Sequence, residues 1–296
     1  MRYRGVDIED TFAEAFTMRA ARVLVTAISD DWARTAARVA TGYGTSVIGC
    51  DAEAGIDCDV APDQTPDGRP GVGFLIFGFS AEAVASALVG RIGQCIMTCP
   101  TTACYDGLEK REKTVKVGGA LRFFGDRHQM SKKIDGRRYW RIPVMDGEFV
   151  CEDVFGVRKA VAGGNFLILG QTQRDTLEAA QAAVEAIGQV PNVTCPFPGG
   201  VVRSGSKVGS AYKKLKASTN DAYCPTLRGV VPSQLPSQVN CVYEIVIDGL
   251  TLDAVRQATR RGIEAACREG VVRISAGNYG GSLGPHHIRL HEVMGE

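Results

Sequence analysis

The sequence lacks an excess of charge of either sign, since its 296 residues contain 34 Lys and Arg against 33 Asp and Glu. It has no run of like charges, so it offers no electrostatic attraction for a nucleic acid or a membrane surface. No apolar run reaches the ~18 residues of a spanning helix, and the N-terminal MRYRGVDIED has no signal-peptide core. We therefore expect a cytoplasmic protein that binds neither nucleic acid nor membrane.

The common nucleotide and hydrolase motifs are also missing. The chain has no GxxxxGK[ST], no GxGxxG that opens a helix after a strand, and no GxSxG. ATP, NAD and a serine hydrolase mechanism are therefore not expected.

Metal-site spacing is missing too, although the chain has ten cysteines. Cys95, Cys99 and Cys104 do not form a CxxC pair, and no second pair or suitably placed histidine follows them. Three C-terminal histidines fit a solvated segment better than a ligand set: His286, His287 and His291. Because the cysteines lie in or beside apolar runs and no export signal is present, we expect reduced, buried thiols and no metal.

Hydrophobic residues make up 45% of the chain, enough for one large domain or for two lobes of about 150 residues each. The first half predicts strand, helix, strand, long loop, strand, helix and strand, over residues 21–28, 32–41, 45–50, 51–71, 72–79, 81–92 and 95–98. Ser29 and Ser80 are the expected N-caps of the two helices. Short strands over residues 120–126 and 137–149, with a turn at Asp135-Gly136, predict a connecting hairpin.

The second half repeats this pattern. Its first strand, helix and strand, which end in PFPGG, match the first strand, helix and strand of the first half at a constant sequence offset. Gly249 and Thr251 then match Gly78 and Ser80 at a larger offset, because residues 203–234 form an insertion. We therefore expect an α+β protein made by duplication of two ferredoxin-like (βαββαβ) lobes, residues 1–148 and 149–296.

One strand carries the main candidate for chemistry. CVYEIVIDGL (residues 241–250) alternates, with Tyr243 and Ile245 on one face and Glu244 between two valines on the other. An isolated carboxylate there is either solvated, paired, or protonated because its pKa is raised. Gly73 occupies the matching position of the first copy, so the acid belongs to one copy only. An ordinary exposed acid and a catalytic acid-base group both remain open.

Three glycine-rich loops fall in the second lobe: PFPGG, RSGSKVGS and SAGNYGGSLG. Turn formation explains their glycines, and close backbone approach to a ligand is the alternative. Polar side chains of these loops and of STNDAYCP are candidates for binding a substrate: Ser204, Ser206, Lys207, Asn220, Asp221, Tyr223, Asn278 and Tyr279.

Long segments of both halves resemble the formylmethanofuran:tetrahydromethanopterin formyltransferase family, among them GVDIEDTFAEAF, TPDGRPG, GGNF, PFPGG, SGSKVG, ASTNDAYCP, CVYEIVIDGL and SAGNYGG. The resemblance implies transfer of a formyl group between the amine of methanofuran and N5 of tetrahydromethanopterin. It implies no metal and no covalent intermediate. It also implies that Glu244 is the family's proposed catalytic glutamate.

The chemistry agrees with the residue types. Formyl transfer passes through a tetrahedral carbon, so the attacking amine loses a proton and the leaving nitrogen gains one. A single carboxyl group of raised pKa can serve both steps. Main-chain N–H groups, Asn220 or Asn278 are candidates for binding the oxyanion.

The near-neutral charge and the many cysteines are similar to the bacterial branch of this family, which works as one component of a formyltransferase/hydrolase complex. The resemblance implies self-association, an amidohydrolase-type hydrolase subunit as partner, and tetrahydromethanopterin and methanofuran as coenzyme substrates with no tightly bound cofactor. A non-catalytic scaffold subunit and folate-type formyl transfer are the alternatives. The residues do not set the reaction direction.

Overall fold

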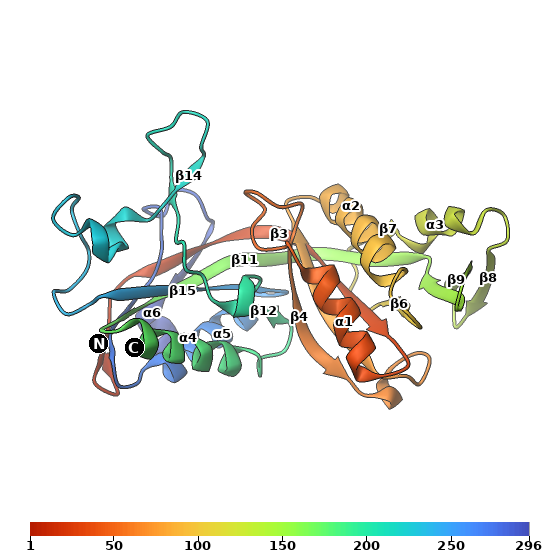
Figure 1. Ribbon diagram of the computed structural model, residues 1–296, viewed down its shortest axis with the longest axis horizontal. Helices are drawn as coiled ribbons and strands as arrows, with labels where there is room; N and C mark the ends of the chain where they lie inside the picture. Colours follow the sequence, from red (N-terminus) through yellow and green to blue (C-terminus); the bar gives the residue numbers. More distant parts are fainter. Residues whose placement is uncertain (296) are drawn as a thin grey trace. The chain divides into compact units, whose positions relative to one another are not determined.

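The computed structural model describes residues 1–295, and the chain divides into two compact units (Figure 1). Unit 1 combines Met1–Thr17 with the chain from Val161 onward, and unit 2 is Met18–Ala160. The chain passes from one unit to the other within two long strands, β3 (Phe12–Thr26) and β11 (Val154–Gly170). The units therefore differ from the expected ranges, 1–148 and 149–296, in the N-terminal segment and around β11.

Unit 2 is built on an antiparallel sheet in which β4, β5, β3 and β6 lie in that order. Three further strands, β10, β9 and β8, continue the sheet beyond β6, and β7 pairs with the first part of β11. The bounds are β4 (Glu53–Val60), β5 (Gly71–Gly78), β6 (Ala103–Asp106), β7 (Lys113–Lys116), β8 (Met130–Ile134), β9 (Arg137–Val144) and β10 (Gly147–Glu152).

Two helices cover one face of this sheet, α1 (Asp30–Thr41) and α2 (Ala81–Arg91). Each begins after a serine whose hydroxyl accepts a backbone N–H, as the sequence predicts: Ser29 accepts from Trp32 and Ser80 from Ala83. The alanines of α1 and the aliphatic residues of α2 are buried against the large side chains of β5. The helix and N-cap predictions for this half are confirmed.

Three strand predictions in unit 2 are wrong, and the first two concern residues 45–50 and 95–98. Residues 45–50 form turns, and the strand is β4, which lies inside the stretch expected to be a long loop. Strand β4 has a partly polar sequence that does not predict a strand. It is a strand because its backbone pairs with the hydrophobic strand β5. Residues 92–96 continue α2 as a π-helical turn instead of forming a strand, since a short apolar run fits a buried helix equally well.

The predicted hairpin is present, with one difference. Strands β8 and β9 pair across Asp135 and Gly136, which both have positive φ, as a two-residue hairpin turn requires. Residues 120–126, expected to be a strand, instead end the short helix α3 (Gly118–Leu121) and continue in a 3₁₀ turn.

The strands of unit 1 repeat the antiparallel arrangement of unit 2, with β12, β15, β11 and β16 in that order. Strand β2 pairs in parallel with β16, β1 pairs with β2, and β17 pairs with the start of β3. The bounds are β1 (Arg2–Tyr3), β2 (Val6–Ile8), β12 (Val193–Thr194), β15 (Cys241–Gly249), β16 (Val271–Ser275), β17 (His286–Arg289), α4 (Gln173–Ile187), α5 (Leu252–Ala266) and α6 (Leu290–Met294).

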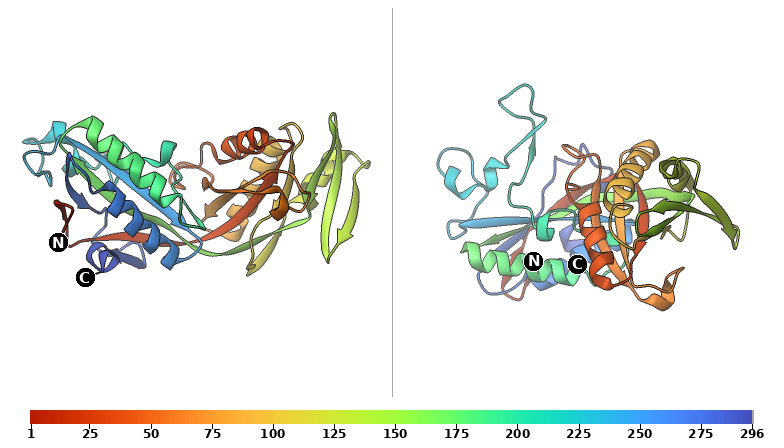
Figure 2. Two further views of the ribbon diagram at one scale, coloured as in Figure 1. Left: turned by 90° about the horizontal axis from the view of Figure 1, so that it is seen from below. Right: turned by 45° about the vertical axis from the view of Figure 1, so that its right-hand side comes forward.

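The two faces of this sheet are covered by different parts of the chain. Phe166 and Ile168 of β11 face α4 and α5, which lie below the strands in Figure 1 and side by side in the left view of Figure 2. Leu167 and Leu169 point the other way and pack with Tyr223 of the insertion and with Leu235 and Val239, which follow it. The insertion lies above the strands in Figure 1. The insertion contains only two short strands, β13 (Lys207–Val208) and β14 (Ala217–Ser218).

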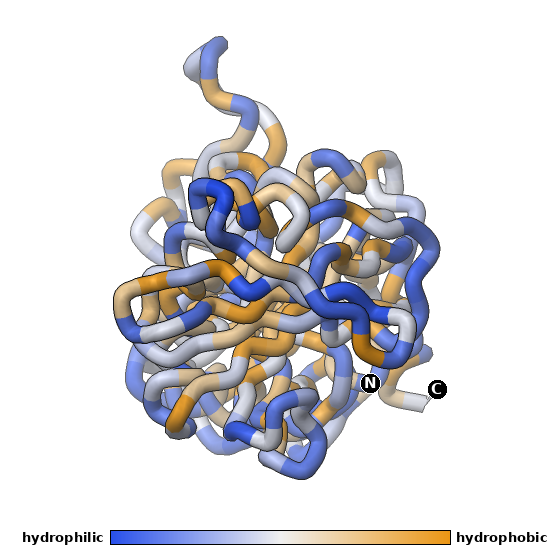
Figure 3. The backbone as a smooth tube through the Cα atoms, turned by 90° about the vertical axis from the view of Figure 1, so that its right-hand side faces the viewer, coloured by the Kyte–Doolittle hydropathy of each residue, from blue (hydrophilic) through white to orange (hydrophobic). Residues whose placement is uncertain are grey.

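Hydrophobic and hydrophilic stretches alternate along the backbone, and many of the hydrophilic ones lie at the edge of the view in Figure 3. Among the helices of residues 1–295, none is long and apolar enough to cross a membrane.

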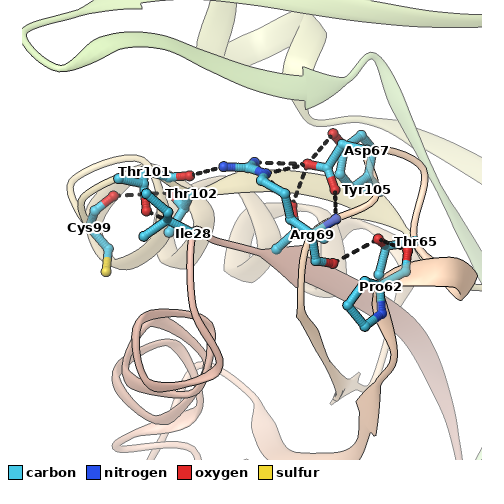
Figure 4. Close-up of polar contacts among 10 residues, drawn as sticks. Ile28, Pro62, Thr65, Asp67, Arg69, Cys99, Thr101, Thr102 and Tyr105 are labelled. Atoms are coloured by element: carbon cyan, nitrogen blue, oxygen red, sulfur yellow. Dashed lines mark hydrogen bonds and ion pairs between the residues drawn. The ribbon is translucent and has the colours of Figure 1, made fainter.

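The TPDGRPG segment of unit 2 is held by a polar cluster (Figure 4). Asp67 Oδ2 accepts hydrogen bonds from the hydroxyls of Thr26 and Tyr105 at 2.7 and 3.0 Å. Arg69 pairs with the same carboxylate at 2.8 Å and donates to the carbonyl of Thr101. The TPDGRPG motif is therefore explained by contacts that anchor this loop.

Candidate functional site

Glu244 lies in the middle of the unit 1 sheet. It is on β15, directly opposite Leu167 of β11, and its backbone forms an isolated bridge with Val202 through two hydrogen bonds of 2.8 and 3.0 Å. The expected alternation is confirmed, since Tyr243 and Ile245 are buried on the helix-covered face. Glu244 is therefore on the opposite face, which the insertion covers.

The Glu244 carboxyl has an unusual electrostatic environment. Its side chain is only partly exposed, and burial raises the pKa of Glu244 to about 7. Desolvation is the single cause, because no cation or hydrogen-bond donor of the described residues offsets it. An acid in this state gains and loses a proton near neutral pH, which is the property of a general acid-base group.

Tyr279 lies close enough to Glu244 for the Glu244 charge to act on the Tyr279 phenol. The Tyr279 hydroxyl forms a hydrogen bond with the Ser206 side chain. Burial raises the pKa of Tyr279, and the nearby Glu244 and Glu14 charges raise it further. The site thus combines one carboxyl group, one phenol and one hydroxyl from three separate segments of unit 1.

The two asparagines have different surroundings. The Asn278 amide donates to Thr11 Oγ1 at 3.3 Å and to the Phe12 carbonyl at 3.2 Å, so its N–H groups already hold the loop to β3. Asn220 precedes a 3₁₀ turn of the insertion, and its carbonyl accepts the backbone N–H of Tyr223 at 3.0 Å.

Lys207 and Asp221 form an ion pair of 2.5 Å in the insertion. The hydrogen bond from Lys207 holds the pKa of Asp221 below its ordinary value. Both line a pocket of about 440 Å³ together with β13, β14 and the loop that joins them, whereas Glu244 does not line it. Ser204 is exposed beside this region.

Tyr223 is placed by packing. Its ring lies against the cluster of Leu167, Leu169 and Leu235 on the insertion-covered face, and its hydroxyl is 3.4 Å from Ser275 Oγ. Burial raises the pKa of Tyr223. This tyrosine therefore lies on the same sheet face as Glu244.

Two residues that the sequence pattern did not single out are central to the site. Glu14 accepts four backbone N–H groups of the 279–284 loop, and the Asn165 amide exchanges two hydrogen bonds with Gly277, two residues before that loop. Both lie in recognisable segments, TFAEAF and GGNF, but nothing in their spacing relates them to SAGNYGGSLG. Only the tertiary structure brings these segments together.

Unit 2 has a pocket of its own, of about 620 Å³, lined by Arg22, Cys58, Gly73, Arg111 and others. It contains none of the predicted site residues. No group of three or more His, Cys, Asp and Glu side chains arranged to hold a metal occurs within residues 1–295.

The sheet thus presents a carboxyl group of near-neutral pKa close to a phenol, which suits an enzyme that moves a proton during group transfer. Comparisons with known proteins give the family. A model described as formylmethanofuran-tetrahydromethanopterin formyltransferase matches residues 1–144, and one described as "FTR, proximal lobe" matches residues 147–293. The chain belongs to the formylmethanofuran-tetrahydromethanopterin formyltransferase family and is an enzyme that transfers one-carbon formyl groups.

Its relatives come from bacteria and archaea. The chain is 54% identical to the formylmethanofuran-tetrahydromethanopterin formyltransferase of Methylobacillus flagellatus and 55% to that of Methanopyrus kandleri, in both cases over 99% of this chain and 100% of the relative. It is 53% identical to a subunit of the formyltransferase/hydrolase complex of Methylorubrum extorquens, over 98% of this chain and 96% of the relative.

Solved structures agree. The formyltransferase of Methanosarcina barkeri matches with a TM-score of 0.95 at 48% identity, over 99% of this chain and 100% of that one. A chain of the Methylorubrum extorquens formyltransferase/hydrolase complex, solved with methylofuran, matches with a TM-score of 0.97 at 51% identity, over 99% and 98%. The expected family is confirmed, and the mixed α+β architecture is that of these enzymes.

Proposed function

We propose that this enzyme transfers a formyl group between the amine of a methanofuran-type coenzyme and N5 of tetrahydromethanopterin, with Glu244 as the general acid-base residue. The observation that carries the assignment to Glu244 is the burial that raises its pKa to about 7 without a neutralising partner. The relatives' names supply the two coenzymes.

Glu244 acts twice in one turnover. Its carboxylate accepts the proton of the attacking amine as the nitrogen–carbon bond forms, and the resulting carboxylic acid donates that proton to the leaving nitrogen as the old bond breaks. The carboxyl group ends in its starting state, so no further proton donor is required. The same sequence of steps serves either direction.

Tyr279 and Ser206 bind the reacting groups beside Glu244. A neutral phenol in a partly buried site is a hydrogen-bond donor suited to an oxygen that becomes negative in the transition state. The Tyr279 phenol stays neutral because burial and the adjacent carboxylates raise its pKa. The polar side chains of the insertion contact the more distant parts of the coenzymes: Ser204, Lys207, Asn220, Asp221 and Tyr223. Asn278 fixes the loop that carries Tyr279.

We also infer that the protein is a duplication of two ferredoxin-like lobes, residues 1–148 and 149–296, with Met1–Thr17 packed into the compact unit of the second lobe. Each sheet orders its four strands in the same way. Gly78 and Gly249, at the ends of β5 and β15, both pack against the first valine of the following helix, since an added Cβ would meet Val84 at 3.2 Å or Val255 at 2.8 Å. The N-caps Ser80 and Thr251 match as well.

The partners and compartment follow from the same family. We expect self-association and a role within a formyltransferase/hydrolase complex that has an amidohydrolase-type hydrolase subunit, because a relative of similar length is named as a component of such a complex. A cytoplasmic location is supported by the ten cysteines, which are all free thiols. The coenzyme substrates are the only cofactors required, so dialysis against a chelator should leave the rate unchanged.

Formyl transfer by purified Glu244→Gln tests the proposal. Glutamine keeps the shape of the carboxyl group but cannot accept a proton, so kcat should fall by about a hundredfold or more. The assay compares tetrahydromethanopterin with tetrahydrofolate as formyl carriers, and a surface variant, Glu292→Gln, serves as the control. Equal activity of Glu244→Gln and wild type would refute the role of Glu244. Inactivity of the wild type with both carriers would indicate a scaffold subunit.

A further inference from the structure

Glu14 makes an uncommon set of contacts. It lies on β3 in unit 1, is 1% exposed, and its carboxylate accepts hydrogen bonds from four backbone N–H groups of a single loop. Oε2 accepts from Tyr279 and from Gly281 at 3.1 Å, and Oε1 accepts from Leu283 at 2.9 Å and Gly284 at 3.0 Å. The loop thus wraps around one side chain.

These contacts keep Glu14 ionised although it is buried. Desolvation raises the pKa of Glu14, but the four backbone hydrogen bonds lower it by more, so its net shift is downward. The opposite holds for Glu244, which has no such donors. Unit 1 therefore contains one buried glutamate that stays charged, Glu14, and one partly exposed glutamate that changes its protonation near neutral pH, Glu244.

The loop is attached at two further points. The Asn165 side chain accepts the Gly277 N–H at 2.7 Å and donates to the Gly277 carbonyl at 3.1 Å. Asn278 donates to Thr11 and Phe12 of the segment that contains Glu14. Tyr279 follows these anchors directly, and its own N–H is one of the four that Glu14 accepts.

The consequence is a fixed position for the Tyr279 ring. A tyrosine on a glycine-rich loop would otherwise sample many orientations, because the nearby Gly277, Gly280 and Gly281 restrict the backbone little. Glu14 binds the loop on both sides of Gly280, and the phenol then lies beside Ser206 and Glu244. A neutral side chain at position 14 would leave some of these buried or partly buried N–H groups without an acceptor.

We propose that Glu14 is a positioning residue for formyl transfer, which holds the Tyr279 phenol beside Glu244 by binding the backbone of the 279–284 loop. This inference rests on the proposed function of Glu244 and goes beyond it, because Glu14 touches no reacting atom. Its effect on the reaction passes through Tyr279.

The test is a double-mutant cycle in the full-length enzyme. Glu14→Gln keeps one acceptor oxygen but turns an amide N–H group toward the loop donors, so kcat should fall by about a hundredfold, as expected for a misplaced catalytic contact. In a Tyr279→Phe background the same substitution should lower kcat by less than about threefold, since the phenol it positions is already absent. A role in general stability only would give the same fold-change in both backgrounds, and that outcome overturns the proposal.

Hydrogen exchange gives the second readout. Glu14→Gln should increase exchange at the amides of residues 279–284 and leave β15 unchanged, whereas Glu292→Gln, a surface variant in the same unit, should change neither exchange nor kcat. If Glu14→Gln does not fold, Glu14→Asp retains the charge on a shorter side chain and should show the same pattern with a smaller loss. If Glu14→Asp and Glu14→Gln both fold and both keep the wild-type kcat and hydrogen exchange, the positioning role of Glu14 is also overturned.

The outcomes separate the two proposals. If Glu244→Gln is inactive and Glu14→Gln behaves as wild type, only the positioning role of Glu14 fails. If Glu244→Gln is fully active, the proposed mechanism fails whatever Glu14 does.

Discussion

At the scale of single residues, Glu14 and Glu244 of unit 1 show how local donors decide the state of a carboxyl group. Glu14 and Glu244 are of one residue type and both lie on strands. Four backbone N–H groups keep the first ionised, while the second has only a desolvated environment. Residue type alone therefore says little about chemical role.

The raised pKa of Glu244 predicts the pH dependence of the reaction. Because the carboxylate is the form that accepts the proton of the attacking amine, kcat/KM should fall as pH decreases through about 7. Steady-state rates from about pH 5.5 to about pH 9 measure this limb. The Glu244→Gln enzyme should retain a low activity without the limb, and persistence of an identical limb would assign it to another group.

The same shift predicts a stability cost. The folded-state pKa of Glu244, about 7, exceeds its ordinary value of 4.5, so between these values the folded chain holds a proton that the unfolded chain has lost. Stability contributed by the protonated form is thus present below pH 4.5 and lost as pH rises through about 7. Glu244→Gln should raise the free energy of unfolding by about 1–3 kcal/mol at about pH 8.

Urea unfolding at about pH 5 and about pH 8 measures that difference. The gain of Glu244→Gln over wild type should be markedly larger at the higher pH, where wild-type Glu244 is charged. A gain that is equal at the two pH values would contradict the raised pKa.

At the scale of elements, helix starts are set by short-range contacts that the sequence displays. The hydroxyl of Thr251 accepts the N–H of Ala254 at 3.1 Å at the start of α5, as Ser80 does for Ala83 in α2. Such caps depend on a few consecutive residues only, which is why both were predictable.

Removal of these caps tests the equivalence of the two elements. Thr251→Ala and Ser80→Ala should each lower the free energy of unfolding by about 1 kcal/mol, because a backbone N–H at each helix start loses its acceptor. Denaturant unfolding measures the change. Thr226→Ala, at an exposed position, is the control and should be near neutral. No loss in either cap variant would show that water replaces the hydroxyl.

Strands were less predictable than helices. Strand β4 was missed because its residues, EAGIDCDV, are partly polar and lie in a stretch rich in turn signals, and its partner β5 supplies the pairing that makes it a strand. Pairing across a sheet joins residues far apart in sequence, and no local pattern reports it.

At the scale of the whole molecule, the first residues of the chain belong with the last half. Ile8 is 1% exposed, and β2 pairs with β16 near the C-terminus. Met18–Ala160 forms the other unit. The N-terminal segment is therefore part of the core that supports Glu14 and Glu244.

Ile8→Ala tests this arrangement. The cavity should cost about 2–5 kcal/mol and increase hydrogen exchange in β16 and β2, with β4 and β5 of unit 2 unchanged. Hydrogen exchange with mass spectrometry resolves these segments. Ile134→Ala, at an exposed position on β8, should leave exchange in unit 1 unaltered. An effect of Ile8→Ala confined to unit 2 would refute the division.

The sequence by itself determined the α+β class, the helix caps, the β8–β9 turn and the alternation that sets Glu244 apart from its buried neighbours. These features depend on residues within a few positions of one another, where side-chain chemistry and backbone periodicity act directly. The long motifs also determined the family.

The tertiary structure alone decided that Glu14 and Asn165 hold the loop of Tyr279 and that the Asn278 amide is already engaged by β3. It also decided that the pKa of Glu244 rises, because desolvation depends on which segments cover the sheet face. Each of these facts arises from contacts between residues far apart in sequence, whose energies follow from packing and not from local pattern.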